Sequence, residues 1–393
     1  MKIITYINHI DEVEVLVENK ITEAIVGVDL FSRFGRIKID QVNELAKKLK
    51  ENGIRPVFEW DVLMVETRFQ AIVSRLKEID LSLFDAIRVQ DPGAINYVIE
   101  HLPNHKIQLN LETGNHNLIG IKRWISLAKD RVERIVLSIE FPKEKLASYL
   151  QELKTPIEFL GLGRILLFYT PRSLLTPHLI DHDDSEVISV HERPIEIKGS
   201  SEESPHSGFP IVENMHGTFM FNIKDHCLLE NFGELKEMGL EYVRIDLRFF
   251  ENKSALLPEI AKLATSPDVE LANVCKKIYG VPVIRGYYNV NKSDALFSKL
   301  KNTKILRKDG SYLGDVMEVN KKKHIGILIR NSERALVVGQ NIRFRTPEGK
   351  EKTLEVTEIK NSSHMNVDKA TNGMVVFVPH VSGISVKSNV YLD

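Results

Sequence analysis

Residues 158–176 read EFLGLGRILLFYTPRSLLT. The stretch begins as an apolar run, passes through Gly163 and Arg164, continues apolar, and ends in a polar turn around Pro171. An apolar run that opens into a polar loop is typical of a buried strand in an α/β fold, where functional groups lie just beyond the carboxyl end of the strand. We therefore predict a strand over residues 156–167 and a functional loop after it.

The chain before this stretch repeats one pattern, in which a short apolar segment is followed by a helical segment. Units of this kind form a parallel sheet with right-handed crossovers, and eight of them close into a barrel. We therefore predict an α/β fold, a TIM-like parallel β/α barrel. The other seven strands are expected at residues 2–6, 23–31, 55–62, 84–89, 106–111, 134–139 and 241–247.

The repeat breaks between the seventh and eighth strands. Residues 177–222 are largely polar, with short strand-like segments at 187–192, 209–213 and 217–222. Long polar connections at the carboxyl end of a barrel strand usually carry function. We expect this segment to be an inserted hairpin region on the active face of the barrel.

The pattern of the sequence changes again near residue 305. Short apolar segments from there on alternate with turn pairs such as Asn372-Gly373, which predicts a small C-terminal all-β barrel. This part has 14 lysines and arginines against 10 aspartates and glutamates, with its densest charge at Lys321-Lys322-Lys323. The predicted domains are residues 1–300 for the β/α barrel, with the insertion at 177–222, and residues 305–393 for the β-barrel.

The composition excludes several classes of protein. The 393 residues carry a net charge of −1, so no global field points to nucleic acid or to a membrane surface. No run approaches the roughly 18 apolar residues of a membrane helix, and the N-terminus carries acids early, unlike a signal peptide. The two cysteines, Cys227 and Cys275, cannot build a four-cysteine site and are typical of reduced cytosolic thiols. We expect a cytoplasmic protein with no membrane association, no metal site and no bound cofactor.

Two segments carry a resemblance to a known family. Residues 158–176, together with residues 218–248 (TFMFNIKDHCLLENFGELKEMGLEYVRIDLR), resemble the peptidase U32 family of collagenase-like proteases. The C-terminal part resembles the branch of that family with a terminal β-barrel, which includes tRNA hydroxylation proteins. The resemblance implies a β/α barrel, and it implies prephenate-dependent hydroxylation of RNA as one activity of the family.

The family signature places a glutamate, a glycine five residues later, a cysteine after three more and a second cysteine after seven more. Glu158 and Gly163 match this frame, whereas Leu166 and Ser173 stand at the two cysteine positions. The cysteines of the family hold an iron–sulfur cluster, which needs soft thiolate ligands, normally four. We therefore predict that this chain has no iron–sulfur cluster of its own.

Polar residues stand at the ends of several predicted strands, and such ends converge on one cavity in a barrel. A guanidinium group suits a dicarboxylate or a phosphate, so a small-molecule carboxylate is one of the expected ligands. The alternative is a network of arginines and carboxylates that merely closes the barrel. The candidate ligand-binding residues are Gln90, Glu112, Arg164 and Arg172, and the candidate catalytic residues, at positions that resemble acids and an arginine of the family, are Glu140, Asp246 and Arg248.

His226 and Cys227 raise the separate possibility of a cysteine nucleophile. Neighbours on a helix point away from each other, and we place Cys227 on a predicted helix as a buried core residue.

Three functions remain open. The first is a role in tRNA base hydroxylation or a related RNA modification, with RNA as a partner. The second is a degenerate U32 subunit that binds a ligand, or a second U32-family chain, without catalysis, which the loss of the cysteines favours. The third is a collagenase-like peptidase, for which the residues offer no nucleophile–base pair or metal site.

Overall fold

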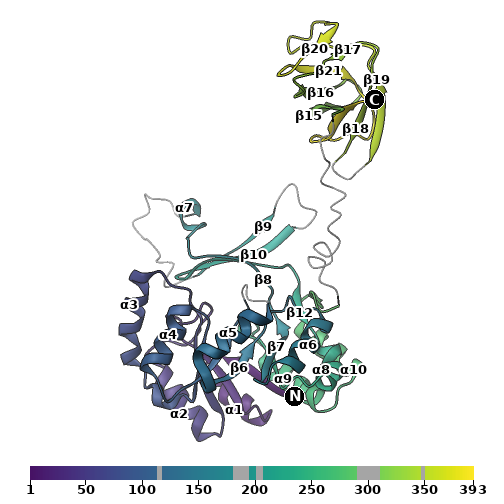
Figure 1. Cartoon of the computed structure of the whole chain (residues 1–393). Helices are drawn as coiled ribbons and strands as arrows, with labels where there is room; N and C mark the ends of the chain where they lie inside the picture. Colours follow the sequence, from purple (N-terminus) through teal and green to yellow (C-terminus); the bar gives the residue numbers. More distant parts are fainter. Residues whose placement is uncertain (113–116, 180–193, 201–206, 290–309, 347–349) are drawn as a thin grey trace. The chain divides into compact units, whose positions relative to one another are not determined.

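The structure is a computed structural model, which describes residues 1–112, 117–179, 194–200, 207–289, 310–346 and 350–393 (Figure 1). The chain separates into two compact units, Met1–Lys292 and Ser293–Asp393. Among the residues described, no helix is long and apolar enough to cross a membrane.

The first unit is a closed barrel of eight parallel strands. The barrel closes because β13 pairs with β1, where Lys2 faces Tyr242, and also with β7, where Tyr242 faces Glu158. This confirms the predicted TIM-like β/α barrel. Its strands are β1 (Lys2–Ile7), β2 (Glu23–Gly27), β3 (Arg55–Trp60), β4 (Ala86–Val89), β5 (Lys106–Asn110), β6 (Val132–Val136), β7 (Ile157–Gly163) and β13 (Tyr242–Ile245).

Helices surround the barrel and cover its strands (Figure 1). In α2 the buried residues Val42, Leu45, Ala46 and Leu49 follow the spacing of one helical face, which packs into the main core. The helices of the ring are α1 (Glu12–Glu18), α2 (Val42–Glu51), α3 (Glu66–Arg75), α4 (Pro92–His101), α5 (Leu118–Ala128), α6 (Lys143–Glu152), α8 (Phe232–Glu237), α9 (Lys253–Thr265) and α10 (Val269–Tyr279).

The apolar run that begins at Glu158 forms two strands instead of the single predicted strand. β7 ends at Gly163, and β8 (Leu166–Thr170) belongs to a separate antiparallel sheet. Gly163 lies so close to β13 that a Cβ atom there would come within 2.9 Å of the Cβ atom of Asp246. Apolar content does not distinguish one long strand from two short ones, so the insertion begins near residue 166 rather than at 177.

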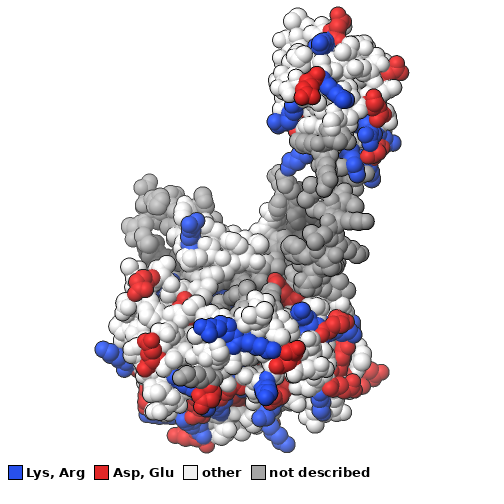
Figure 2. All heavy atoms as spheres, viewed as in Figure 1, with Lys and Arg blue, Asp and Glu red and all other residues white. Residues whose placement is uncertain are grey.

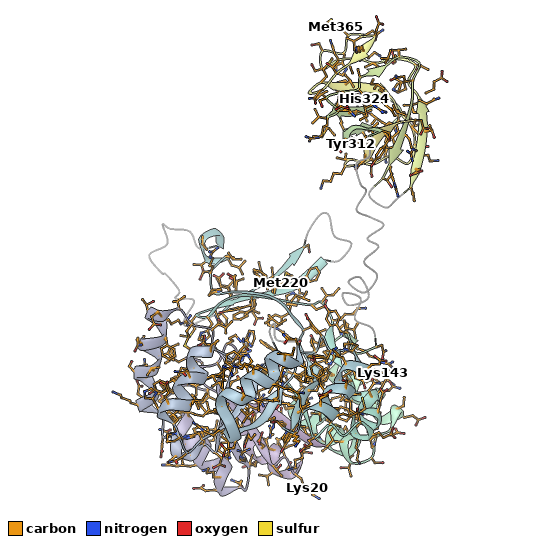
Figure 3. All side chains as sticks on the ribbon, in the orientation of Figure 1. Lys20, Lys143, Met220, Tyr312, His324 and Met365 are labelled. Carbon is orange, nitrogen blue, oxygen red and sulfur yellow. The ribbon has the colours of Figure 1, made fainter. Side chains whose placement is uncertain are left out.

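The inserted sheet has the order β8-β11-β10-β9 and lies across one end of the barrel (Figure 1). Figure 3 shows Met220 on this sheet and Lys20, which precedes β2, at opposite ends of the unit, so the sheet lies over the carboxyl ends of the barrel strands. The predicted strand at 187–192 falls outside the described residues. The other elements of the insertion are α7 (Thr176–Leu179), β9 (Ile195–Ser200), β10 (Ser207–Asn214) and β11 (Gly217–Phe221).

Two short strands extend the barrel sheet beyond β7. β12 (Asp225–Cys227) runs antiparallel to β7, and β14 (Val283–Ile284) pairs with β12. Cys227 is thus in a strand, and the predicted helix at this position is wrong. The cysteine is buried in the main core, as predicted.

The second unit is an antiparallel six-stranded sheet, curved as a half-barrel, in the order β19-β18-β22-β15-β16-β21, with a two-stranded sheet beside it. It has a hydrophobic core of its own, which includes Leu313, Ile327 and Phe344. Its strands are β15 (Tyr312–Asn320), β16 (His324–Ile329), β17 (Leu336–Val337), β18 (Asn341–Arg345), β19 (Glu351–Glu355), β20 (Lys369–Ala370), β21 (Val375–Pro379) and β22 (Asn389–Leu392).

Candidate functional site

The interior of the barrel contains buried charges. Glu158 on β7 and Arg88 on β4 are both fully buried and form a two-point ion pair, with N–O distances of 2.9 and 2.5 Å. Arg134 and Arg244 each place a guanidinium nitrogen 3.4 Å from the same carboxylate. Burial alone would raise the pKa of Glu158, but the three arginines outweigh it and lower that pKa. The signature glutamate therefore holds barrel strands together from inside.

A cavity of about 100 Å³ opens above these charges at the carboxyl ends of the strands. We call it the inner cavity. Four of the seven predicted site residues lie together in its wall. The wall consists of Arg33, Phe34, Glu112, Ile139, Leu160, Arg164, Leu166, Phe221, Arg244, Asp246, Arg248 and Phe249.

Arg248 and Asp246 form one side of the inner cavity. The Nε atom of Arg248 donates to Oδ1 of Asp246 at 3.0 Å, and Nη2 donates to Oδ2 at 2.6 Å. The guanidinium also lies 3.6 Å from the ring centroid of Tyr6. Tyr6 in turn donates to Glu59 at 2.5 Å, and burial, reinforced by the charge of Asp61, raises the pKa of Glu59. Arg248 is therefore held rigidly over a buried carboxyl group.

Arg33 and Arg244 complete the polar wall, and each is paired. Arg33 donates from Nε to Asp61 at 3.0 Å and from Nη2 to Gln90 at 3.0 Å. The predicted residue Gln90 thus stands behind the cavity and orients Arg33. Arg244 pairs with Glu112 as well as with the buried carboxylate of β7.

Arg164 differs from the other arginines of the inner cavity. Within the described part of the chain it makes no ion pair, and its Nη1 atom is buried without a hydrogen-bond partner. Its guanidinium lies 4.0 Å from the ring centroid of Phe249 and 5.4 Å from that of Phe221. A half-buried guanidinium held against two rings without a carboxylate is suited to bind an anion.

Besides Gln90, two predicted residues are not part of the cavity wall. Glu140 is exposed, one residue beyond Ile139, which does line the cavity. Arg172 is exposed in the loop after β8, where its backbone carbonyl accepts a hydrogen bond from Thr218 at 2.8 Å. The strand ends predicted from sequence were too long in both regions, which misplaced these side chains.

Sequence reasoning did not name the other eight residues of the wall as site residues, and these include Arg33, Phe34, Arg244 and Phe249. A signal existed for Arg244, because it stands two residues before Asp246 in a strand and alternate residues of a strand face the same side. No periodic signal exists for Arg33 and Phe34, which reach the cavity from an irregular loop after β2.

The thiols of this chain do not fit an iron–sulfur cluster. Leu166, at one signature cysteine position, lies in the wall of the inner cavity and offers no ligand atom. Cys227 and Cys275 are both buried; burial raises the pKa of both thiols, that of Cys275 to about 11. Among the described residues, no group of three or more potential ligands is arranged to hold a metal ion. Two protonated thiols do not supply the four thiolates that such a cluster needs.

The sequence of residues 8–255 matches the profile of peptidase family U32, well over half of the chain. The chain belongs to peptidase family U32. Curated relatives of this U32 chain include tRNA hydroxylation protein P of Haemophilus influenzae, 20% identical over 54% of this chain and 54% of the relative. They also include tRNA hydroxylation protein P2 of Bacillus subtilis, 21% identical over 56% of this chain and 69% of the relative.

The U32 chain thus spans about half the length of the Haemophilus relative. Among solved structures, it is similar to dihydrodipicolinate synthase from Bacillus clausii, with a TM-score of 0.37 and 9% identity over 78% of this chain and 98% of that chain. It is also similar to phosphoribosylanthranilate isomerase from Pyrococcus furiosus, with a TM-score of 0.36 and 10% identity over 67% of this chain and 98% of that chain.

Proposed function

We propose that this U32 chain takes part in tRNA base hydroxylation or a related tRNA modification, and that its inner cavity binds a small carboxylate. Membership of the family and the names of its curated relatives support the RNA substrate. The observation that supports a carboxylate ligand is the state of Arg164, a half-buried guanidinium with no ion-pair partner among the described residues.

The charges around Arg164 support an anionic ligand. Arg33, Arg244 and Arg248 each face at least one carboxylate, so their charges are largely neutralised. Arg164 therefore contributes the uncompensated positive charge of the inner cavity. A carboxylate bound there gains a charge-assisted hydrogen bond in a partly desolvated site, where such bonds are stronger than in water.

Each polar group has a separate task in this proposal. Arg164 binds the carboxylate, and Phe249 fixes its guanidinium. Asp246 orients Arg248 toward the rest of the ligand, and the Tyr6–Glu59 pair lies beneath, where burial raises the pKa of Glu59. The chain has no thiolate set for a cluster, so we assign any redox step to a second chain, for which another U32-family protein is the candidate.

A comparison of RNA nucleosides tests the proposal. We expect mass spectrometry of bulk tRNA to show a hydroxylated nucleoside in cells that make this chain and a loss of that nucleoside in cells that lack it. Identical nucleoside profiles in the two strains would contradict a role in tRNA modification. Cleavage of denatured collagen by the purified protein would instead favour the peptidase function.

A further inference from the structure

A second cavity of about 230 Å³ lies beside the inner one, between the loop after β2 and the inserted sheet. We call it the outer cavity. It shares Arg33, Phe34 and Phe249 with the inner cavity, so the two spaces adjoin across these side chains. The proposed function gives the outer cavity no role.

The walls of the outer cavity are held in place by specific contacts. His216, which follows β10, faces the backbone carbonyl of Asp29 at 2.6 Å and Nη2 of Arg68 at 2.8 Å. Asn214 donates a hydrogen bond to the carbonyl of Arg33 at 2.8 Å. The loop also turns tightly at Gly35, where a Cβ atom would lie 2.5 Å from the carbonyl oxygen of Val28. The inserted sheet and the barrel loop therefore form one preorganised pocket.

Arg36 is a cation of the outer cavity that makes no ion pair in the described part of the chain. Burial lowers the pKa of its guanidinium, and the nearby charge of Glu196 partly offsets this. Lys38 pairs with Asp29 at 2.7 Å, and Glu196 also lines the cavity but makes no ion pair with Arg36. The guanidinium of Arg36 lies 5.3 Å from the ring centroid of Phe249, the same ring that Arg164 contacts from the inner cavity. One aromatic ring thus lies between two guanidinium groups, neither of which makes an ion pair among the described residues.

We propose that the outer cavity binds a backbone phosphate of the RNA substrate, next to the nucleotide whose base faces the inner cavity. This inference rests on the proposed function, and it adds a second anion-binding site, for a phosphate, to the site for the carboxylate. A guanidinium binds a phosphate through paired hydrogen bonds, and an aromatic wall suits the ribose and base of an unpaired nucleotide.

The surface charge supports a local phosphate site. On the face of the barrel unit drawn in Figure 2, basic and acidic side chains are interspersed, without a large basic field. A surface with interspersed positive and negative charges does not attract RNA over a long range. The affinity for RNA then depends on a few basic side chains positioned to contact phosphates. Arg36 is such a group.

Fluorescence anisotropy of the full chain with a fluorescently labelled tRNA tests the inference. We expect Arg36→Glu to weaken RNA binding about tenfold or more and to reduce the salt dependence by about one phosphate contact, while Arg36→Lys keeps part of the affinity. Arg123→Glu is the matched control, because it makes the same charge change on the exposed surface of α5. We expect that control to bind RNA within about twofold of the wild type. Melting temperatures show that each variant is folded.

Several results would overturn the inference. One is equal weakening by Arg36→Glu and Arg123→Glu, which would mean non-specific attraction; another is no RNA binding by the wild type. A third is that Arg36→Glu changes the binding of a small dicarboxylate, such as malonate, and does not change the binding of RNA. That result would make the outer cavity a second carboxylate site. If cells need the chain for the modified nucleoside but Arg36→Glu binds RNA normally, this inference alone fails and the proposed function stands.

Discussion

We expect Glu158→Gln to destabilise the barrel severely without changing its shape. The substitution keeps the size of the side chain but removes the charge that faces Arg88 at 2.5 and 2.9 Å and faces Arg134 and Arg244 at 3.4 Å. Loss of one partner from a buried ion pair costs about 3–5 kcal/mol, because the remaining charge stays buried without compensation. For a unit of this size, the melting temperature should fall by on the order of 10 °C.

The stabilisation by Glu158 also depends on pH. Its pKa is lower in the folded protein than in the unfolded chain, so the stabilisation is complete above the unfolded pKa and is lost as the pH falls through the folded one. The difference in unfolding free energy between the wild type and Glu158→Gln should therefore shrink in acid. Urea unfolding, followed by circular dichroism at several pH values, measures this difference.

Two variants serve as controls. Glu152→Gln removes a carboxylate from an exposed pair with Lys122 and should cost less than about 1 kcal/mol. Arg88→Met combined with Glu158→Leu removes the central pair as a unit, while Arg134 keeps Glu23 as a partner, so the double variant should be more stable than Glu158→Gln. A Glu158→Gln variant within 1 kcal/mol of the wild type would refute the view that this carboxylate is structural.

Two further predictions follow from the site. Burial, aided by Arg68, lowers the pKa of His216 to about 4, so the unfolded chain takes up a proton first as the pH falls. Acidification from neutral pH toward pH 4 should therefore cost about 3 kcal/mol through this residue, and thermal melts of His216→Asn should lack that part of the pH dependence; the same pH dependence in both proteins would contradict it. Protein purified without air should be colourless, without stoichiometric iron; about four irons per chain in a metal analysis would show that a cluster binds despite the missing cysteines.

The sequence predicts the barrel well because each strand is a short apolar segment between helices with a clear apolar face, as in α2. It predicts strand ends less well, because apolar residues continue past Gly163 into a different sheet. Arg164, directly after β7, lies in the wall of the inner cavity, whereas Arg172, in the loop after β8, does not.

The candidate site is only partly visible in the sequence for a related reason. Asp246 and Arg248 come just after the end of β13, so a predicted strand end places them near the cavity. Arg33 and Arg36 lie in an irregular loop, and their positions depend on contacts with an inserted sheet distant in sequence. Glu158 is the opposite case. Its place in a family motif suggests a functional role, whereas its carboxylate pairs with arginines inside the barrel and stabilises the fold.

The measurement that most directly tests the link between the inner cavity and RNA modification is complementation of a strain that lacks this chain. Plasmids would supply the wild type, Arg164→Ala or the surface control Arg123→Ala, and mass spectrometry would quantify hydroxylated nucleosides in tRNA at equal protein levels. We predict that the wild type and Arg123→Ala restore the nucleoside and that Arg164→Ala does not. Full restoration by Arg164→Ala would contradict the claim that this arginine binds a ligand needed for the modification.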